Sequence, residues 1–131
     1  MQVSTERRLL QLLVALAGLV PVMAGLMGAL SGSAFFELAG AAAAQSHGTY
    51  LSGLLLGIGL AFWSCIPVIE HKEARFFVLT GIVVIGGVSR AFFAIALGAA
   101  SPIVWLALAM ELVVTPGLYL WVGRIAALLA P

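Results

Sequence analysis

Two oppositely charged residues, Arg90 and Glu111, lie inside long apolar stretches of the sequence. A lone charge in the middle of a membrane-spanning helix costs about 2.5–3.5 kcal/mol on insertion scales. An arginine and a carboxylate offset this cost when they form charge-assisted hydrogen bonds to each other. The two residues therefore predict an ion pair that faces the interior of a helix bundle.

The positions of these two charges in their segments favour the same depth. Arg90 lies seven residues before Leu97, and Glu111 lies eight residues after Ile103. At 1.5 Å per residue, they are roughly 10 Å and 12 Å from the same boundary. The five-residue connection 98–102 makes the two segments antiparallel neighbours. Two interpretations stay open: a structural clip between two helices, or a site for a ligand, a proton or a substrate.

Other polar side chains are expected at the same end of the protein, and they form a candidate ligand-binding set with the pair: Glu37, His47, Tyr50 and Thr115. Such a set could bind an anionic headgroup or carry out acid–base chemistry. Tyr50 and His47 also have a simpler interpretation as residues of the membrane interface. A histidine without partner ligands makes no metal site. Cys65 is the sole cysteine, which excludes an intrachain disulfide and a multi-cysteine metal site. No metal and no cofactor are predicted.

The composition determines which elements must position these residues. Hydrophobic residues make up 63% of the 131 residues and charged residues 8%. Soluble domains average about 45–50% and about 25%. The chain is therefore predicted to have the lipid bilayer as its solvent. A net charge of +1 and the lack of a basic stripe argue against nucleic acid as a partner.

Four apolar segments of about 20 residues predict an all-α fold, with one domain over residues 1–131 that forms a bundle of four transmembrane helices. The segments are Leu9–Leu30, Thr49–Ile69, Phe76–Leu97 and Ile103–Val122. A short outer interfacial helix is expected between the first two, beginning at Ser33 and ending near Gln45 and Ser46. Ser101 and Pro102 predict a capped start for the fourth helix, and Pro116 predicts a kink within it.

Basic residues predict the orientation of the bundle. Five of the six lie on one side of the four segments, and the connections 31–48 and 98–102 contain no Lys or Arg. The positive-inside rule makes that side cytoplasmic, so both termini are expected in the cytoplasm. The first apolar run, at 22 residues, is longer than a signal-peptide core, so an uncleaved helix is expected.

Small residues predict where helices approach closely. Gly18 and Gly25 lie in the first segment, and Gly53 and Gly57 form a GxxxG pair in the second. Such residues allow close backbone contact in lipid. They are compatible with packing inside one chain and with a homo-oligomer.

Several short motifs resemble a known family. They are Ser46-His47 before Tyr50-Leu51-Ser52-Gly53, then Gly86-Gly87-Val88-Ser89-Arg90, and Glu111-Leu112 with Pro116. In this order they are similar to the bacterial family catalogued as domain of unknown function 4345. The resemblance implies a four-helix protein of the bacterial inner membrane, with Arg90 and Glu111 in the family pattern. Family members often carry an aromatic and a basic residue after the histidine, where this chain has Gly48-Thr49.

Three functional hypotheses follow. The first is a non-enzymatic protein that binds a lipophilic or anionic small molecule, or a partner membrane subunit, through an outer-leaflet polar pocket. The second is an isomerase- or cyclase-type membrane enzyme, with Glu111 as acid or base, Arg90 holding it, and Tyr50 or His47 as a second proton donor. The third is a small transporter that works as an oligomer.

Overall fold

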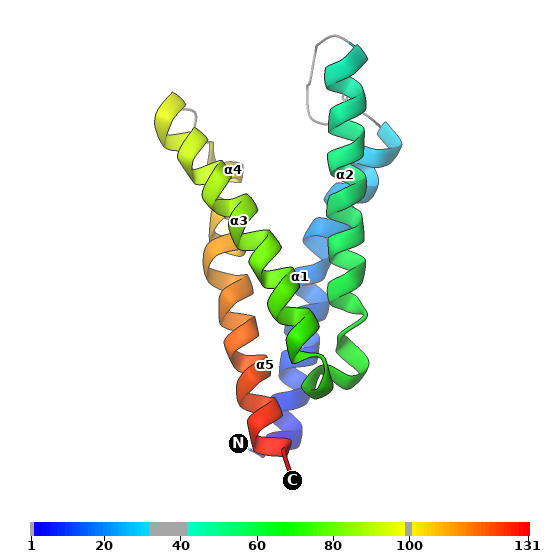
Figure 1. Ribbon diagram of the computed structural model, residues 1–131, viewed down its shortest axis with the longest axis vertical. Coiled ribbons are helices and arrows are strands. Elements are labelled where there is room, and N and C mark those ends of the chain that lie inside the picture. The colour runs from blue at the N-terminus through cyan, green and yellow to red at the C-terminus, as the bar shows by residue number, and fades with distance from the viewer. Residues whose placement is uncertain (1, 32–41, 99–100) are drawn as a thin grey trace. The chain divides into compact units, whose positions relative to one another are not determined.

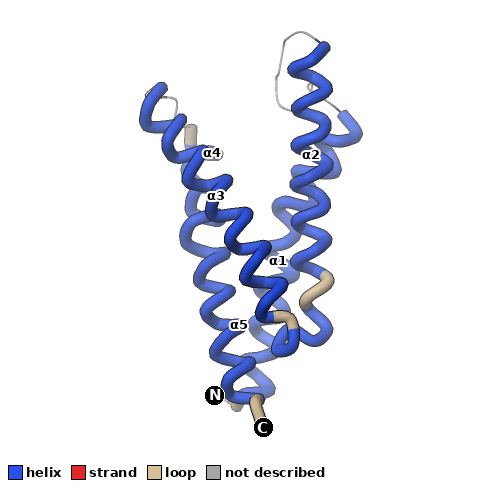
Figure 2. Tube along the Cα trace, viewed as in Figure 1, coloured by secondary structure: helices blue, strands red, loops and turns tan. Residues whose placement is uncertain are grey.

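A computed structural model describes residues 2–31, 42–98 and 101–131, and every regular element in these ranges is helical (Figures 1 and 2). The elements in chain order are α1 (Val3–Ser31), α2 (Ala42–Trp63), the 3₁₀ segment η2 (Ile66–His71), α3 (Glu73–Leu97), α4 (Pro102–Ala109), the π turn η3 (Met110–Val114) and α5 (Thr115–Leu129). The predicted all-α class is confirmed for this part of the chain.

Three helical stretches are long and apolar enough to cross a membrane: Val3–Leu30, Glu73–Ala96 and Pro102–Leu129. They overlap the first, third and fourth predicted segments, but the predicted bounds were too short. The first helix begins at Val3 and not at Leu9, and the third begins three residues before Phe76. The fourth continues to Leu129, past the predicted end at Val122. The second segment gives a shorter apolar stretch, Gly48–Trp63, within α2. The described residues therefore contain three candidate spans where four were predicted.

The predicted bounds of the second helix, Thr49–Ile69, were wrong at both ends. α2 begins at Ala42 because alanine has the highest helix propensity, so the alanine run continues into the helix. It ends at Trp63, four residues before Pro67, which has no N–H for a helical hydrogen bond. The short outer helix was predicted to end near residue 46, but residues 42–46 belong to α2. The rest of that helix, with Glu37, lies outside the described residues.

The fourth predicted helix is continuous from Pro102 to Leu129, but a π turn divides it into α4, η3 and α5. Its predicted start is confirmed, because the Ser101 side chain accepts a hydrogen bond from the N–H of Val104 and Pro102 occupies the first turn. The preceding helix, α3, ends at Leu97 and is capped by Gly98, whose φ of 61° is a left-handed conformation that glycine adopts without strain.

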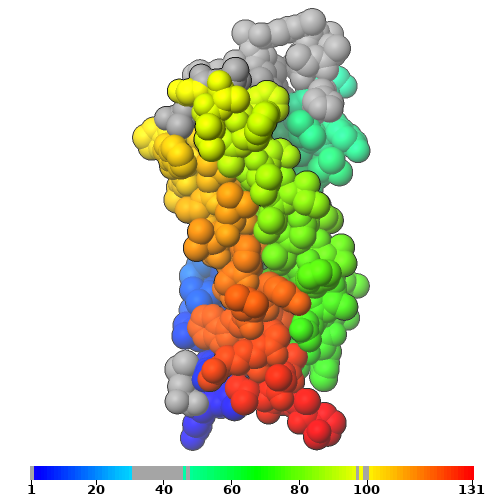
Figure 3. Space-filling model, turned by 60° about the vertical axis from the view of Figure 1, so that its left-hand side comes forward, coloured from blue at the N-terminus to red at the C-terminus, as the bar shows by residue number. Residues whose placement is uncertain are grey.

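The chain forms two compact units. The first contains residues up to Leu12 and from Pro67 onward. In this unit, α3 and α5 lie side by side (Figures 1 and 3). Phe77 of α3 contacts Tyr119 of α5, with ring centroids 5.5 Å apart. Its fully buried large side chains come from four elements: Leu10, Ile69, Phe76, Val122 and Ile125. These side chains hold the start of α1, η2, α3 and α5 in one core.

The second unit, Leu13–Ile66, pairs the rest of α1 with α2. A Cβ atom added at Gly25 would lie 2.7 Å from the carbonyl oxygen of Ser52, so only glycine permits this backbone approach. The Trp63 indole N–H donates to the carbonyl of Ala15 at 3.1 Å. In contrast, a Cβ at Gly53 or Gly57 would meet no described atom within 4 Å. Gly25 thus serves packing within the chain, whereas the role of the GxxxG pair stays a prediction.

Candidate functional site

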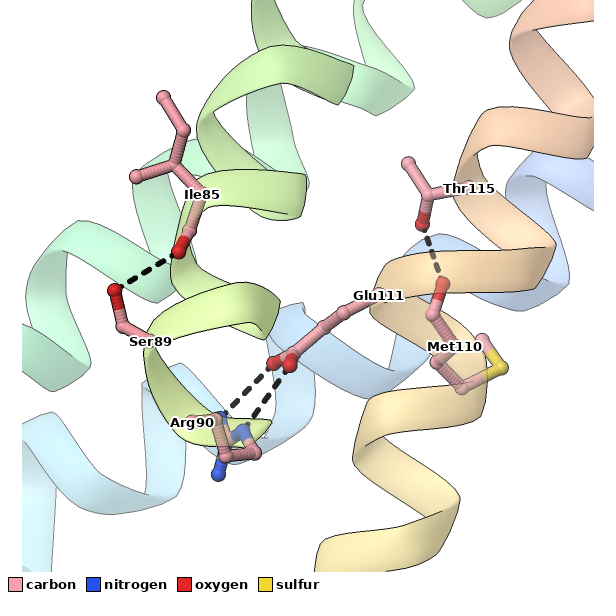
Figure 4. Close-up of polar contacts among 6 residues, drawn as sticks. All are labelled: Ile85, Ser89, Arg90, Met110, Glu111 and Thr115. Carbon is pink, nitrogen blue, oxygen red and sulfur yellow. Dashed lines mark hydrogen bonds and ion pairs between the residues drawn. The ribbon is translucent and has the colours of Figure 1, made fainter. Parts of the chain in front are cut away.

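Arg90 of α3 and Glu111 of η3 form the predicted ion pair, and Figure 4 shows both hydrogen bonds that join them. The Arg90 Nε donates to Glu111 Oε2 at 3.1 Å, and the Nη2 donates to Oε1 at 2.9 Å. This bidentate arrangement fixes the orientation of both side chains and is stronger than a single contact. The predicted ion pair between Arg90 and Glu111 is therefore confirmed.

Gly87, one turn before Arg90, sets the distance between the two elements. A Cβ atom at this position would lie 2.9 Å from the Cβ of Glu111 and 2.8 Å from Cδ2 of Leu112. Ordinary contacts of such atoms begin at 3.4 Å. Glycine therefore lets α3 approach the π turn closely enough for the guanidinium and carboxylate to meet.

The π turn around Glu111 results from a shifted hydrogen-bond register before Pro116. The backbone N–H of Thr115 donates to the carbonyl of Met110, five residues earlier. That N–H is the donor which an α-helix would have supplied to the carbonyl of Glu111. The next residue, Pro116, has no N–H. The Glu111 carbonyl is therefore left without a donor from either the α or the π register.

The Thr115 hydroxyl reinforces this turn. It donates to the carbonyl of Met110 at 2.8 Å and is drawn doing so in Figure 4. Thr115 was predicted to belong to the candidate ligand-binding set around the pair, and that role stays a prediction. Its hydroxyl proton is instead directed at the backbone. We interpret Thr115 as a residue that stabilises the π turn.

The exposure of the pair is uneven. The Glu111 side chain is 20% exposed, and that of Arg90 is 47% exposed. Within the described part of the chain, Arg90 directs only Nε and Nη2 to an acceptor, so Nη1 keeps its donors. Ser89, next to Arg90, donates to the carbonyl of Ile85 at 3.0 Å and so makes a local contact of its own. The predicted burial is therefore largely met for the carboxylate but not for the guanidinium.

The other predicted site residues belong to the second unit or lie outside the described structure. Tyr50 lies in α2 with its side chain exposed. His47 also lies in α2, but its side chain is not among those described, and Glu37 is outside the described residues. Their convergence with Arg90 and Glu111 stays a prediction. Among the described residues, no three His, Cys, Asp or Glu side chains are grouped so that they could hold a metal ion.

Two further ion pairs join the start of α1 to the rest of the first unit, and sequence reasoning missed both. Arg7 forms a bidentate pair with Glu70 of η2, at 2.8 and 3.0 Å, and also donates to a carbonyl in η2. Glu6 pairs with Arg124 of α5 at 3.3 Å. The hydrogen bond from Arg7 holds the pKa of the Glu70 carboxyl below its usual value, against an opposing effect of burial. The sequence signal that could have suggested these ion pairs was Glu6, directly before Arg7 and Arg8.

The fold and the site together define a small all-helical protein whose long apolar helices suit a membrane and contain a bidentate Arg–Glu pair. A family model matches residues 9–122, and the chain belongs to this family, described as Domain of unknown function (DUF4345). The predicted family is thus confirmed. Searches of the curated proteins and of the solved structures found no match.

Proposed function

We propose that the protein is a four-helix protein of the bacterial inner membrane with both termini in the cytoplasm. α2 supplies the fourth span, because its 22 residues extend about 33 Å at 1.5 Å per residue, enough for a hydrocarbon core of about 30 Å. The distribution of Lys and Arg supports the orientation. Topology reporters fused to each terminus test the orientation. Both fusions should report a cytoplasmic location, and a terminus reported outside the cytoplasm would contradict the proposal.

In this membrane, the protein binds a lipophilic small molecule with an anionic or polar headgroup at Arg90 and Glu111. The observation that carries this function is the half-exposed Arg90, which holds Glu111 through one edge of its guanidinium and keeps Nη1 for another acceptor. A pair that served only as a structural clip would be expected to direct all of its donors inward. The Nη1 donors, for which no acceptor lies among the described residues, favour binding over a purely structural role.

The backbone at Glu111 adds a second polar group to this site. Its carbonyl lacks a helical donor because of the π turn and Pro116. Unsatisfied backbone groups are costly in lipid, where water is scarce. π turns inside α-helices occur frequently at functional sites. A ligand that carries both an acceptor and a hydroxyl group could satisfy Arg90 and this carbonyl.

The depth of the site fits such a ligand. Arg90 lies seven residues before the end of α3, about 10 Å along the helix axis. With the proposed orientation, this end of α3 is at the outer leaflet, so the headgroup of the ligand would sit just below the lipid headgroups. Its apolar part would then extend inward along α3 and lie against exposed apolar side chains such as Ile82.

Native mass spectrometry of the protein released from nanodiscs tests the function. Wild type should carry a defined extra mass that Arg90→Ala and Glu111→Ala lose. Ser89→Ala is the matched control, since Ser89 is adjacent but hydrogen-bonded to its own helix, and it should retain the mass. If every variant carries the same bulk lipid, or if the extra mass is a protein subunit, the small-molecule function is wrong.

A further inference from the structure

The charges around Glu111 limit the kind of ligand that the site can accept. Among the elements that the structure describes, α3, α4 and α5 pack against η3. α4 contains no titratable side chain. On α5, Tyr119 and Arg124 lie two or more turns away, and the remaining charges of α3, Glu73 and Arg75, lie at its opposite end. Within the described residues, Arg90 is therefore the charged group that faces Glu111, and the site is electrically neutral.

A bound anion disturbs this neutrality. If an anionic headgroup binds to the free donors of Arg90, one guanidinium faces two anions and the site has a net charge of −1. An uncompensated charge inside the apolar part of a membrane is strongly disfavoured. The addition of one proton to the Glu111 carboxylate restores a net charge of zero, with a neutral carboxyl group, a guanidinium and the bound anion.

The geometry permits this exchange. Both oxygens of Glu111 accept hydrogen bonds from Arg90. Protonation converts one of these oxygens into a hydroxyl group, which no longer accepts well from Arg90. The guanidinium donor released in this way becomes available to the anion, while the other Glu111 oxygen still accepts. The half-exposed guanidinium gives the anion access from the surface of α3.

We propose that the site binds an anionic amphiphile together with one proton, which is taken up from water by the carboxylate of Glu111. The inference rests on the proposed function and specifies its ligand class and pH dependence. No covalent bond changes, and the site is neutral before and after binding. The affinity for the anion should therefore fall as pH rises, by up to tenfold per pH unit, because one proton binds with each anion.

The test uses the full-length protein in nanodiscs of zwitterionic phosphatidylcholine, with radiolabelled hexadecanesulfonate as the probe. A sulfonate stays ionised across the pH range, so any pH dependence of binding comes from the protein. Binding is measured at pH 5.5, 6.5, 7.5 and 8.5 for wild type, Glu111→Gln and Glu73→Gln. Glu73 lies in the first turn of the same helix, far from the pair, and serves as the control carboxylate. Hexadecanol, which has no charge, measures partition into the lipid.

Wild type and Glu73→Gln should bind the sulfonate progressively more weakly as pH rises, whereas Glu111→Gln should bind it equally at each pH. Calorimetry of wild type in two buffers of different ionisation enthalpy should give an uptake of one proton per sulfonate. This second measurement decides the matter if Glu111→Gln does not fold. Sulfonate binding that is independent of pH, with no proton uptake, would overturn the inference and leave the proposed function intact. Failure to bind the sulfonate at any pH would also overturn it, and the mass-spectrometry experiment would then decide the proposed function separately.

Discussion

Adjacent glycines in α3 offer a sharp test of how the Arg90–Glu111 pair is positioned. Gly86 and Gly87 both lie in the interior of α3, but the atoms next to them differ. A Cβ at Gly86 would meet no described atom within 4 Å, whereas one at Gly87 would lie 2.9 Å from the Cβ of Glu111. Alanine at each position therefore makes the same chemical change with and without a steric conflict.

The expected magnitude follows from these distances. Ordinary contact begins at 3.4 Å, so Gly87→Ala requires a separation of about 0.5 Å (3.4 Å minus 2.9 Å) between α3 and η3. If the whole shift separates the ion pair, its hydrogen bonds of 2.9 and 3.1 Å lengthen to about 3.4 and 3.6 Å, beyond the usual range of about 2.7–3.2 Å. Overpacking of this kind costs about 1–3 kcal/mol.

Both variants also gain helix propensity, which is worth about 0.8–1 kcal/mol for alanine in place of glycine. Gly86→Ala should therefore be neutral or more stable than wild type. The difference between the two variants isolates the steric term, and Gly87→Ala should be the less stable of the two by about 1–3 kcal/mol. It should also retain less of the ligand mass, since the pair is displaced.

The free energy of unfolding in mixed micelles, titrated with a denaturing detergent, measures the stability difference. Native mass spectrometry of the same samples measures retention of the ligand. Equal stability of Gly86→Ala and Gly87→Ala would refute the reasoning, because it would mean that the close approach at Gly87 does not constrain the pair.

Three other predictions concern separate contacts. The pKa of the Glu70 carboxyl is lower in the folded state than its ordinary value of about 4.3. The carboxylate therefore stabilises the folded state at pH values above the ordinary pKa, and this contribution is lost as pH falls through the lower folded-state pKa. Glu70→Gln, which leaves Arg7 with a neutral partner, should thus be less stable than wild type at pH 7. The difference in the free energy of unfolding between the two proteins should become smaller as pH falls below about 5, as acid unfolding measures. Trp63→Phe removes a hydrogen bond between α2 and α1 and should cost about 0.5–1.5 kcal/mol, measured by thermal unfolding; a more stable variant would contradict the contact. Thr115→Val should cost at most about 1 kcal/mol and leave ligand retention unchanged, since its hydroxyl is bonded to Met110; loss of the ligand mass in this variant would place Thr115 in the site after all.

The apolar pattern predicted the regions where helices lie better than it predicted their ends. Hydropathy reports which residues prefer lipid, whereas the end of a helix depends on hydrogen-bond donors and caps. Ser101 and Pro102 were therefore sufficient to predict the start of α4. The second segment was misplaced because its apolar run extends past Pro67, where the helix has already ended, and begins after the alanine run that starts it.

The same distinction explains what could be predicted of the site. Arg90 and Glu111 could be paired from the sequence because depth along two antiparallel helices follows from residue counts alone. Their alignment around the helix axes could not, because it depends on the extra residue of the π turn and on contact at Gly87. Pro116 predicted a kink in the helix, but the irregular backbone lies before the proline. There Thr115 donates to Met110, and Glu111 lies within the resulting π turn. The charged pair and the distorted backbone therefore coincide at one residue, and this coincidence supports the proposal that Glu111 serves binding in addition to helix packing.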